Sequence, residues 1–283
     1  GNTGTLTAAL ATTSVWDDSF KLVQHFEETS GSATDSTTNL NAGTAYLGLV
    51  QGTSSKIGGG IQLDGSNDYM QFADSDTIDY AKDQDFTVSA CVNANTTQVN
   101  TTWQANMIVE KWSSSGGYPY TLRYLNNTYV TPDSFTVGRY DGSNNPGDFS
   151  SSGVGNAYRL LTLTKNGSTL EMFVDGVSQG GTFPDTTTGT TTNASPLYLG
   201  RRGGATAGYF TGYIDELRIS NANRTAAWIK AEYQNQNNAT QGGFFTDVGA
   251  STLGISSSSG AVTLTSNTMA INSTITATGQ TVT

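Results

Sequence analysis

Aromatic side chains gather in the middle of the chain, where they could stack on a ligand. Seven of them fall in one segment: Trp103, Trp112, Tyr118, Tyr120, Tyr124, Tyr129 and Tyr140. Sugar rings have apolar faces that pack on aromatic planes, and nearby Asn, Asp and Thr side chains can bond to the sugar hydroxyls. The residues that we predict to contact a ligand are Trp103, Trp112, Tyr118 and Tyr120.

The spacing of the tyrosines leaves a second interpretation open. Tyr118, Tyr120 and Tyr124 share one strand face with Leu122, because alternate residues of an extended strand point the same way. That pattern is also typical of a stripe of core residues. Trp103 lies in the polar stretch 96–106. It is the better candidate for an exposed anchor, because a tryptophan in a polar loop has few packing partners.

Residues for catalysis are sparse. Glycoside hydrolysis needs two carboxylates on one strand face, about 5 to 5.5 Å apart for retention and further apart for inversion. The glutamates show no such spacing; they are Glu27, Glu28, Glu110, Glu171, Glu216 and Glu232. His25, the only histidine, lies inside the opening strand, and Cys91 is the only cysteine. We therefore expect a protein that is not an enzyme.

Composition favours β structure and excludes two kinds of partner. Charged residues make up only 13% of the chain, and its wealth of Thr, Ser, Asn and Gly suits strands and turns better than helices. The net charge of −10 and the pI of about 4.4 argue against nucleic acid and anionic membrane surfaces. No apolar run approaches the ~18 residues that span a bilayer.

Turn dipeptides punctuate the chain at short intervals. They are Asp64-Gly65, Asp141-Gly142, Asn166-Gly167 and Asp175-Gly176, and such pairs tolerate the positive φ that tight hairpins require. In residues 160–174 an Asn-Gly turn joins two segments in which every second residue is apolar. The pattern predicts antiparallel sheets with one buried face each, the arrangement of a β-sandwich.

Three zones differ in composition. Residues 1–14 lack charge and are interpreted as a leader strand or linker, whereas residues 15–247 contain all the aromatic and charged residues and form the predicted folded domain. Within that domain, one helix is expected from Thr225 to about Gln236. Residues 248–283 alternate weakly without charge, which predicts a neutral, β-rich tail.

Five ordered motifs resemble a known family. They are residues 20–31 (FKLVQHFEETSG, followed by Asp35-Ser36), 57–69 (IGGGIQLDGSNDY), 85–92 (DFTVSACV), 173–176 (FVDG) and 213–219 (YIDELRI). Together they are similar to the laminin-G-like, concanavalin A-like lectin and glucanase family of bacterial and archaeal surface proteins, over about residues 15–247. The resemblance implies an all-β, antiparallel jelly-roll sandwich with one short C-terminal helix, located at the cell surface or outside the cell.

The same resemblance implies one structural calcium ion. Its side-chain ligand would be Asp215, with Glu27 and Gly60 contributing to the shell, because calcium accepts carboxylate and backbone oxygens in irregular geometry. The other interpretation is that Asp215 pairs with Arg218 or caps a turn.

Two functions remain open. The first is a non-catalytic extracellular binding or adhesion domain that recognises a glycan or a surface protein. The second is a structural subunit of a surface filament, layer or virion decoration, in which neighbouring copies join through residues 1–14 and 249–283, because a neutral strand can extend a neighbour's sheet. The tail could equally be the start of another β domain.

Overall fold

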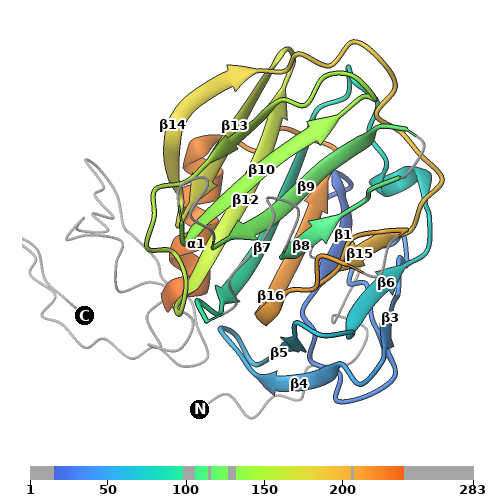
Figure 1. The fold of residues 1–283 in the computed structure, drawn as a ribbon, viewed down its shortest axis with the longest axis vertical. Coiled ribbons are helices and arrows are strands. Elements are labelled where there is room, and N and C mark those ends of the chain that lie inside the picture. Colours follow the sequence, from blue (N-terminus) through green and yellow to red (C-terminus); the bar gives the residue numbers. More distant parts are fainter. Residues whose placement is uncertain (1–15, 98–105, 114–115, 127–131, 205–206, 239–283) are drawn as a thin grey trace, which may run out of the picture. The chain divides into compact units, whose positions relative to one another are not determined.

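The computed structural model describes residues 16–97, 106–113, 116–126, 132–204 and 207–238. In these residues the chain forms two antiparallel β-sheets packed face to face, with one α-helix (Figure 1). The predicted β-sandwich with a short C-terminal helix is therefore confirmed. The segments 1–14 and 248–283 lie outside the described residues, so the domain boundaries and the role of the terminal strands stay predictions.

Sheet 1 runs in the order β14-β13-β12-β7-β16-β5-β4, and β1 also pairs with β16. Its strands are β1 (Phe20–Gln24), β4 (Val50–Ser54), β5 (Gly59–Asp64), β7 (Phe86–Ala94), β12 (Tyr158–Asn166), β13 (Thr169–Val174), β14 (Val177–Pro184) and β16 (Thr211–Ser220). Because several neighbours in the sheet are far apart in sequence, long-range pairing sets this order.

Sheet 2 runs in the order β11-β10-β9-β8-β15-β6-β3-β2. Its strands are β2 (Ser32–Ala33), β3 (Gly43–Tyr46), β6 (Tyr69–Phe72), β8 (Met107–Glu110), β9 (Tyr118–Leu125), β10 (Ser134–Tyr140), β11 (Gly147–Phe149) and β15 (Leu197–Leu199). A short 3₁₀ helix, η2 (Asp76–Ile78), follows β6. Sheet 2 contains most of the aromatic residues that the sequence suggests as ligand contacts, since Tyr118, Tyr120 and Tyr124 lie in β9 and Tyr140 lies in β10.

The hydrophobic core lies between the sheets, and the helix covers part of the outer face of sheet 1. On β7, Val88, Ala90 and Val92 are buried in the core, while Ser89 faces the other way and its hydroxyl donates to Glu232 of α1 (Ala226–Asn238) at 3.0 Å. Figure 1 shows α1 in orange beside β12 to β14. The predicted helix is confirmed.

Three of the four turn dipeptides lie in hairpins, whereas Asp64-Gly65 lies in the connection from β5 of sheet 1 to β6 of sheet 2. The Asn166-Gly167 turn joins β12 to β13 in a register that pairs Asn166 with Thr169. The Asp175-Gly176 turn joins β13 to β14 with φ of 54° and 75° at its two residues, values that a mirror-image turn needs. Among the described residues, no helix is long and apolar enough to cross a membrane.

Asp68, in the turn between β5 and β6, is expected to make stability depend on pH. It is buried and accepts the backbone N–H of Asp64 with both oxygens, at 3.1 and 3.2 Å. Burial raises its pKa from 3.8 to about 6. The folded protein thus binds more protons than the unfolded chain between these values, so this contribution to stability is present below about pH 4 and is lost as the pH rises through 6.

Asp68→Asn should accordingly become more stabilising, relative to the unmodified protein, as the pH rises from 4 to 6. Denaturant unfolding at several pH values measures that difference. A difference that does not change with pH would show that Asp68 titrates normally in the folded state.

Candidate functional site

The predicted ligand residue Tyr120 lies in the core. Its side chain has no exposed surface, and its hydroxyl donates to the carbonyl of Ile78 at 2.8 Å. Tyr124, on the same strand face, is also fully buried. The core-stripe interpretation therefore applies to these two tyrosines, and Tyr120 offers no surface to a ligand.

Tyr118 points to the opposite face of sheet 2 because β9 carries a bulge. The register pairs Thr121 with Gly138 but Tyr118 with Tyr140, so one extra residue on β9 reverses the alternation. The Arg123 guanidinium accordingly lies 5.8 Å from the Tyr118 ring and donates to its hydroxyl at 3.2 Å. The expectation that Tyr118 shares a face with Tyr120 was wrong. The Tyr118 side chain is only 4% exposed. It therefore packs among the other side chains of the outer face, and only the edge of its ring is open to a ligand.

Of the two predicted tryptophans, Trp103 lies outside the described residues and Trp112 lies on this outer face. The Arg202 guanidinium is 5.1 Å from the Trp112 ring. A side chain at Gly203 would come within 2.9 Å of the Trp112 carbonyl oxygen and 3.1 Å of the Tyr198 ring. Only glycine fits there, which brings Trp112 close to a tyrosine 86 residues later in the sequence.

Tyr198 is one end of a row of three tyrosines that crosses three adjacent strands of sheet 2. Tyr46 of β3 stacks on Tyr69 of β6 with ring centroids 4.8 Å apart and planes 8° apart. Tyr69 in turn lies 5.9 Å from Tyr198 of β15. Their strand neighbours Met70 and Leu199 are buried in the core, so the row occupies the outer face. We call Tyr46, Tyr69 and Tyr198 the tyrosine row.

Arg201 holds the row together. Its guanidinium carbon lies 4.3 Å from the Tyr69 ring and 5.0 Å from the Tyr198 ring, within the range of cation–π attraction. Burial raises the pKa of Tyr198 above its ordinary value. Like any tyrosine hydroxyl, it is protonated at neutral pH and can donate a hydrogen bond. The row therefore combines fixed aromatic planes with polar tips.

An open groove of about 390 Å³ borders the row at Tyr46. Its lining is Gly31, Ser32, Thr44, Ala45, Tyr46, Leu47, Gly48, Leu49 and Gln51. Since Tyr69 covers one side of the Tyr46 ring, the other side is left for the groove, and Tyr46 is 36% exposed. Pockets of this volume hold small ligands. The groove offers an aromatic plane beside hydroxyl and amide groups, which matches the chemistry of a sugar.

Sequence reasoning missed the tyrosine row. Its members stand singly in three separate segments, and nothing local links them. The available signal was the alternation itself, because in each short strand the tyrosine alternates with small or apolar residues that face the core.

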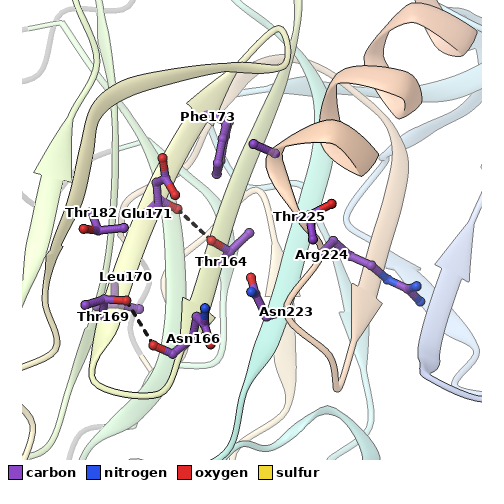
Figure 2. Close-up of a pocket in the computed structure, with 11 residues that line it drawn as sticks. Thr164, Asn166, Thr169, Leu170, Glu171, Phe173, Thr182, Asn223, Arg224 and Thr225 are labelled. Carbon is purple, nitrogen blue, oxygen red and sulfur yellow. Dashed lines mark hydrogen bonds between the residues drawn. The ribbon is translucent and has the colours of Figure 1, made fainter.

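Figure 2 shows a different hollow, on sheet 1 between β12 to β14 and the start of α1. Its volume is about 70 Å³, which suits a few water molecules rather than a sugar ring. The Arg224 side chain is directed away from Glu171 and is held between Phe20 and Trp228, at 4.4 and 4.5 Å. We do not assign a ligand to this hollow.

The three predicted calcium residues meet at a bulge in β16. β16 pairs with β5 up to Ile214 and with β1 from Leu217 onward, and the bulge lies between, where Glu216 has a φ of 50°. Asp215 therefore projects beside the hairpin that leads into β5, and its Oδ2 accepts the N–H of Ile57 at 2.9 Å.

Glu27, just beyond β1, reaches the same hairpin. Its Oε2 accepts the N–H of Gly59 at 3.0 Å. A side chain at Gly60 would lie 2.4 Å from the Ser55 hydroxyl and 3.3 Å from the carbonyl oxygen of Ile214, so only glycine allows this close approach. The tertiary structure thus brings Asp215, Glu27 and Gly60 to one place.

The chemistry of this place fits a hard cation. Oδ1 of Asp215 is buried and has no hydrogen-bond partner, and burial raises the pKa of this carboxyl to about 7. Arg218, the alternative partner, pairs with Glu216 and Glu232 instead. No cluster of three or more His, Cys, Asp or Glu side chains in the described ranges could hold a metal. A cation here would therefore need backbone oxygens as well, as calcium accepts.

Comparison with known proteins identifies the class. The model of the concanavalin A-like lectin/glucanases superfamily matches residues 64–230, so the chain belongs to this family. No curated protein matches the sequence.

Three solved structures illustrate the similarity. The binding domain of Paraclostridial Mosquitocidal Protein 1 is similar with a TM-score of 0.61 and 14% identity, over 76% of this chain and 52% of that one. A second structure is of botulinum neurotoxin type C, a toxin whose cell entry is described as dependent on interaction with two ganglioside molecules. It is similar with a TM-score of 0.59 and 11% identity, over 77% of this chain and 51% of that one.

Domain 4 of AbnA, an extracellular arabinanase from Geobacillus stearothermophilus in complex with arabinotriose, gives a TM-score of 0.52 and 17% identity, over 75% of this chain and 96% of that one. The match spans about half the length of the two toxin chains. At these identities the similarity concerns the fold.

Proposed function

We propose that this chain is a non-catalytic carbohydrate-binding domain that acts outside the cell and binds a glycan through the tyrosine row. The observation that carries the proposal is the row itself, three tyrosines fixed by Arg201 beside an open groove. The arabinotriose and ganglioside named for two structures of the same fold support a sugar as the ligand class.

Among the described residues, no carboxylate pair lines the groove beside the row, which supports a binding role. The described lining of the groove at Tyr46 contains no Asp or Glu. Glu110, the nearest glutamate on sheet 2, is fully buried and bonded to Arg123 at 2.7 Å. Glycoside hydrolysis needs one carboxyl group to protonate and another to attack or activate water.

A panel of immobilised polysaccharides and glycans tests the proposal. The folded protein should be retained by at least one of them, and a soluble fragment of the same sugar should release it. Failure to bind any sugar on a broad panel, with calcium present, would overturn the proposed function. Release of reducing ends from a bound sugar would overturn its non-catalytic part.

A structural calcium ion belongs to the same proposal. Asp215 and Glu27 would supply carboxylate oxygens and the segment around Gly60 would supply backbone oxygens. When bound, the ion would neutralise the buried Asp215 carboxylate and join β1, β5 and β16. Its role would be to stiffen the sandwich rather than to contact the sugar.

Calcium should therefore raise the melting temperature of chelator-treated protein. An ion at about 100 times its Kd adds ~2.7 kcal/mol, or roughly 5 to 10 °C for a domain of this size. In Asp215→Asn the same addition should have little effect, whereas Asp148→Asn, a change at a distant surface position, should keep the full response. An unchanged melting temperature after chelation and readdition would contradict the calcium site.

A further inference from the structure

The outer face of sheet 1 carries a second row of side chains. The row passes through Asn93 of β7, which pairs with a residue of β12 on one side and of β16 on the other. Tyr158 of β12 is opposite Asn93 of β7, Asn93 is opposite Tyr213 of β16, and Tyr213 is opposite Gln62 of β5. Directly paired residues of adjacent strands point to the same side. These four side chains, which we call the amide row, therefore project together from four consecutive strands.

The amide row faces away from the core. The residues next to it in β7, β16 and β5, which are Val92, Ile214 and Ile61, are fully buried in the core, as is Leu161, three residues beyond Tyr158 in β12. Gln62 is exposed, and Asn93 and Tyr213 are partly exposed. Strand alternation thus presents the row to solvent.

A pocket of about 230 Å³ opens over this row. Its lining is Gln62, Leu63, Asn93, Asn95, Asn156, Thr211, Gly212 and Tyr213. The volume lies below the ~300 Å³ at which pockets for drug-sized ligands begin, so it suits one small ring rather than an extended chain segment. Tyr213 is the aromatic residue of the lining, and its ring lies 6.3 Å from the Tyr158 ring at an angle of 53°.

Two side-chain amides of the pocket are available to a ligand, and the lining carries no charge. The side-chain amides of Asn93 and Gln62 make no hydrogen bond to any described residue, so their donors and acceptors face the solvent. In a chain with a net charge of −10, all eight lining residues are neutral. A cationic or anionic ligand would find no partner here, whereas a hydroxyl-rich neutral ring would find an aromatic face and two free amides.

We propose that the amide row is a second sugar site, which binds one neutral monosaccharide unit of a glycan. The ligand class follows the proposed function, but the residues, the sheet and the face are different. Since the tyrosine row and the amide row lie on the outer faces of the two stacked sheets, one molecule would hold two glycan segments at once. Such bivalency raises the apparent affinity for clustered or insoluble glycans well above that of either site.

The test uses side-chain amide signals in NMR spectra, with four neutral probes: the methyl glycosides of glucose, galactose, mannose and arabinofuranose. At least one probe should shift the NH₂ signals of Asn93 and Gln62 in a saturable manner at millimolar concentration. Tyr213→Ala should weaken that binding at least tenfold. Gln62→Ala, a change at an exposed position that leaves the fold intact, should weaken it as well, whereas Tyr69→Ala should leave it unchanged.

The failure of this site can be told apart from failure of the proposed function. If no probe shifts these two signals while the tyrosine row still binds a glycan, the second site is overturned and the proposed function stands. Shifts that persist at full strength in Tyr213→Ala would also overturn the second site. Equal binding of methyl glucuronoside would contradict the preference for neutral sugars.

Discussion

Replacing Arg139 with methionine is expected to lower the free energy of unfolding by about 3 to 5 kcal/mol, because the change leaves a buried carboxylate without its main partner. The Arg139 side chain of β10 is fully buried, and its Nη1 bonds to Asp185 at 2.8 Å. Lys165 is the other nearby cation, but its Nζ is 3.9 Å from Asp185. A shift this large would place Arg139 among the main determinants of stability.

The position of Arg139 explains why the effect should be large. Its Nη2 donates to the carbonyls of Tyr80 and Ala81 at 3.3 and 3.2 Å and to the Thr191 hydroxyl at 2.6 Å. One guanidinium therefore joins β10 to two loops from distant parts of the sequence. Methionine keeps most of the volume but removes these donors. The Tyr80 carbonyl still accepts from the Thr191 hydroxyl at 2.7 Å, whereas each buried group left unsatisfied costs ~1 to 3 kcal/mol.

Arg159→Met is the matched control. Arg159 also pairs with an aspartate at 2.7 Å, Asp175, but its side chain is 36% exposed. Exposed pairs contribute ~0 to 1 kcal/mol because water already solvates both charges. Urea unfolding of both variants measures the two losses in the free energy of unfolding, and equal m-values make these losses comparable. If Arg139→Met costs no more than Arg159→Met, the buried cluster does not have the role assigned to it.

Replacing either Tyr46 or Tyr69 with alanine should weaken glycan binding by about 10- to 100-fold, or roughly 1.4 to 2.7 kcal/mol. Tyr46→Ala removes the plane that borders the groove. Tyr69→Ala removes the ring that supports Tyr46 from behind and the surface on which Arg201 lies. Because the rings touch, the double variant should lose less than the sum of the single variants.

Titration calorimetry with the sugar found by the panel measures these losses. Tyr46→Phe retains the ring and should stay within about threefold of the unmodified protein, since the contact is mainly with the ring face. Trp228→Ala removes an aromatic residue of similar exposure, 45%, from α1 on sheet 1 and should not change binding. Equal losses in the Trp228 and Tyr46 variants would contradict a site on sheet 2.

Local features could be predicted from the sequence. The hairpin of β12 and β13 follows from an Asn-Gly pair between two segments with alternating apolar residues, and α1 follows from a short helical stretch that begins after Thr225. Both depend on interactions within about fifteen residues, so the local sequence carries the information. The five ordered motifs then placed these elements in the correct family.

The candidate sites could be predicted less well from the sequence. The sequence indicated aromatic recognition and placed it at residues 103–140, but Tyr120 is part of the core and the bulge in β9 turns Tyr118 away from it. A bulge of one residue reverses the direction of every side chain beyond it, and composition gives little warning of it.

The sequence by itself determined the class of fold, most of the antiparallel hairpins and the final helix, because each is a property of composition or of neighbours in the chain. Only the tertiary structure decided which tyrosines face solvent and which strands lie side by side. Tyr46, Tyr69 and Tyr198 form a row because β6 pairs with β3 on one side and, across more than a hundred residues of intervening chain, with β15 on the other. Tyr158, Asn93, Tyr213 and Gln62 meet for the same reason, since long-range strand pairing joins residues that no local pattern connects.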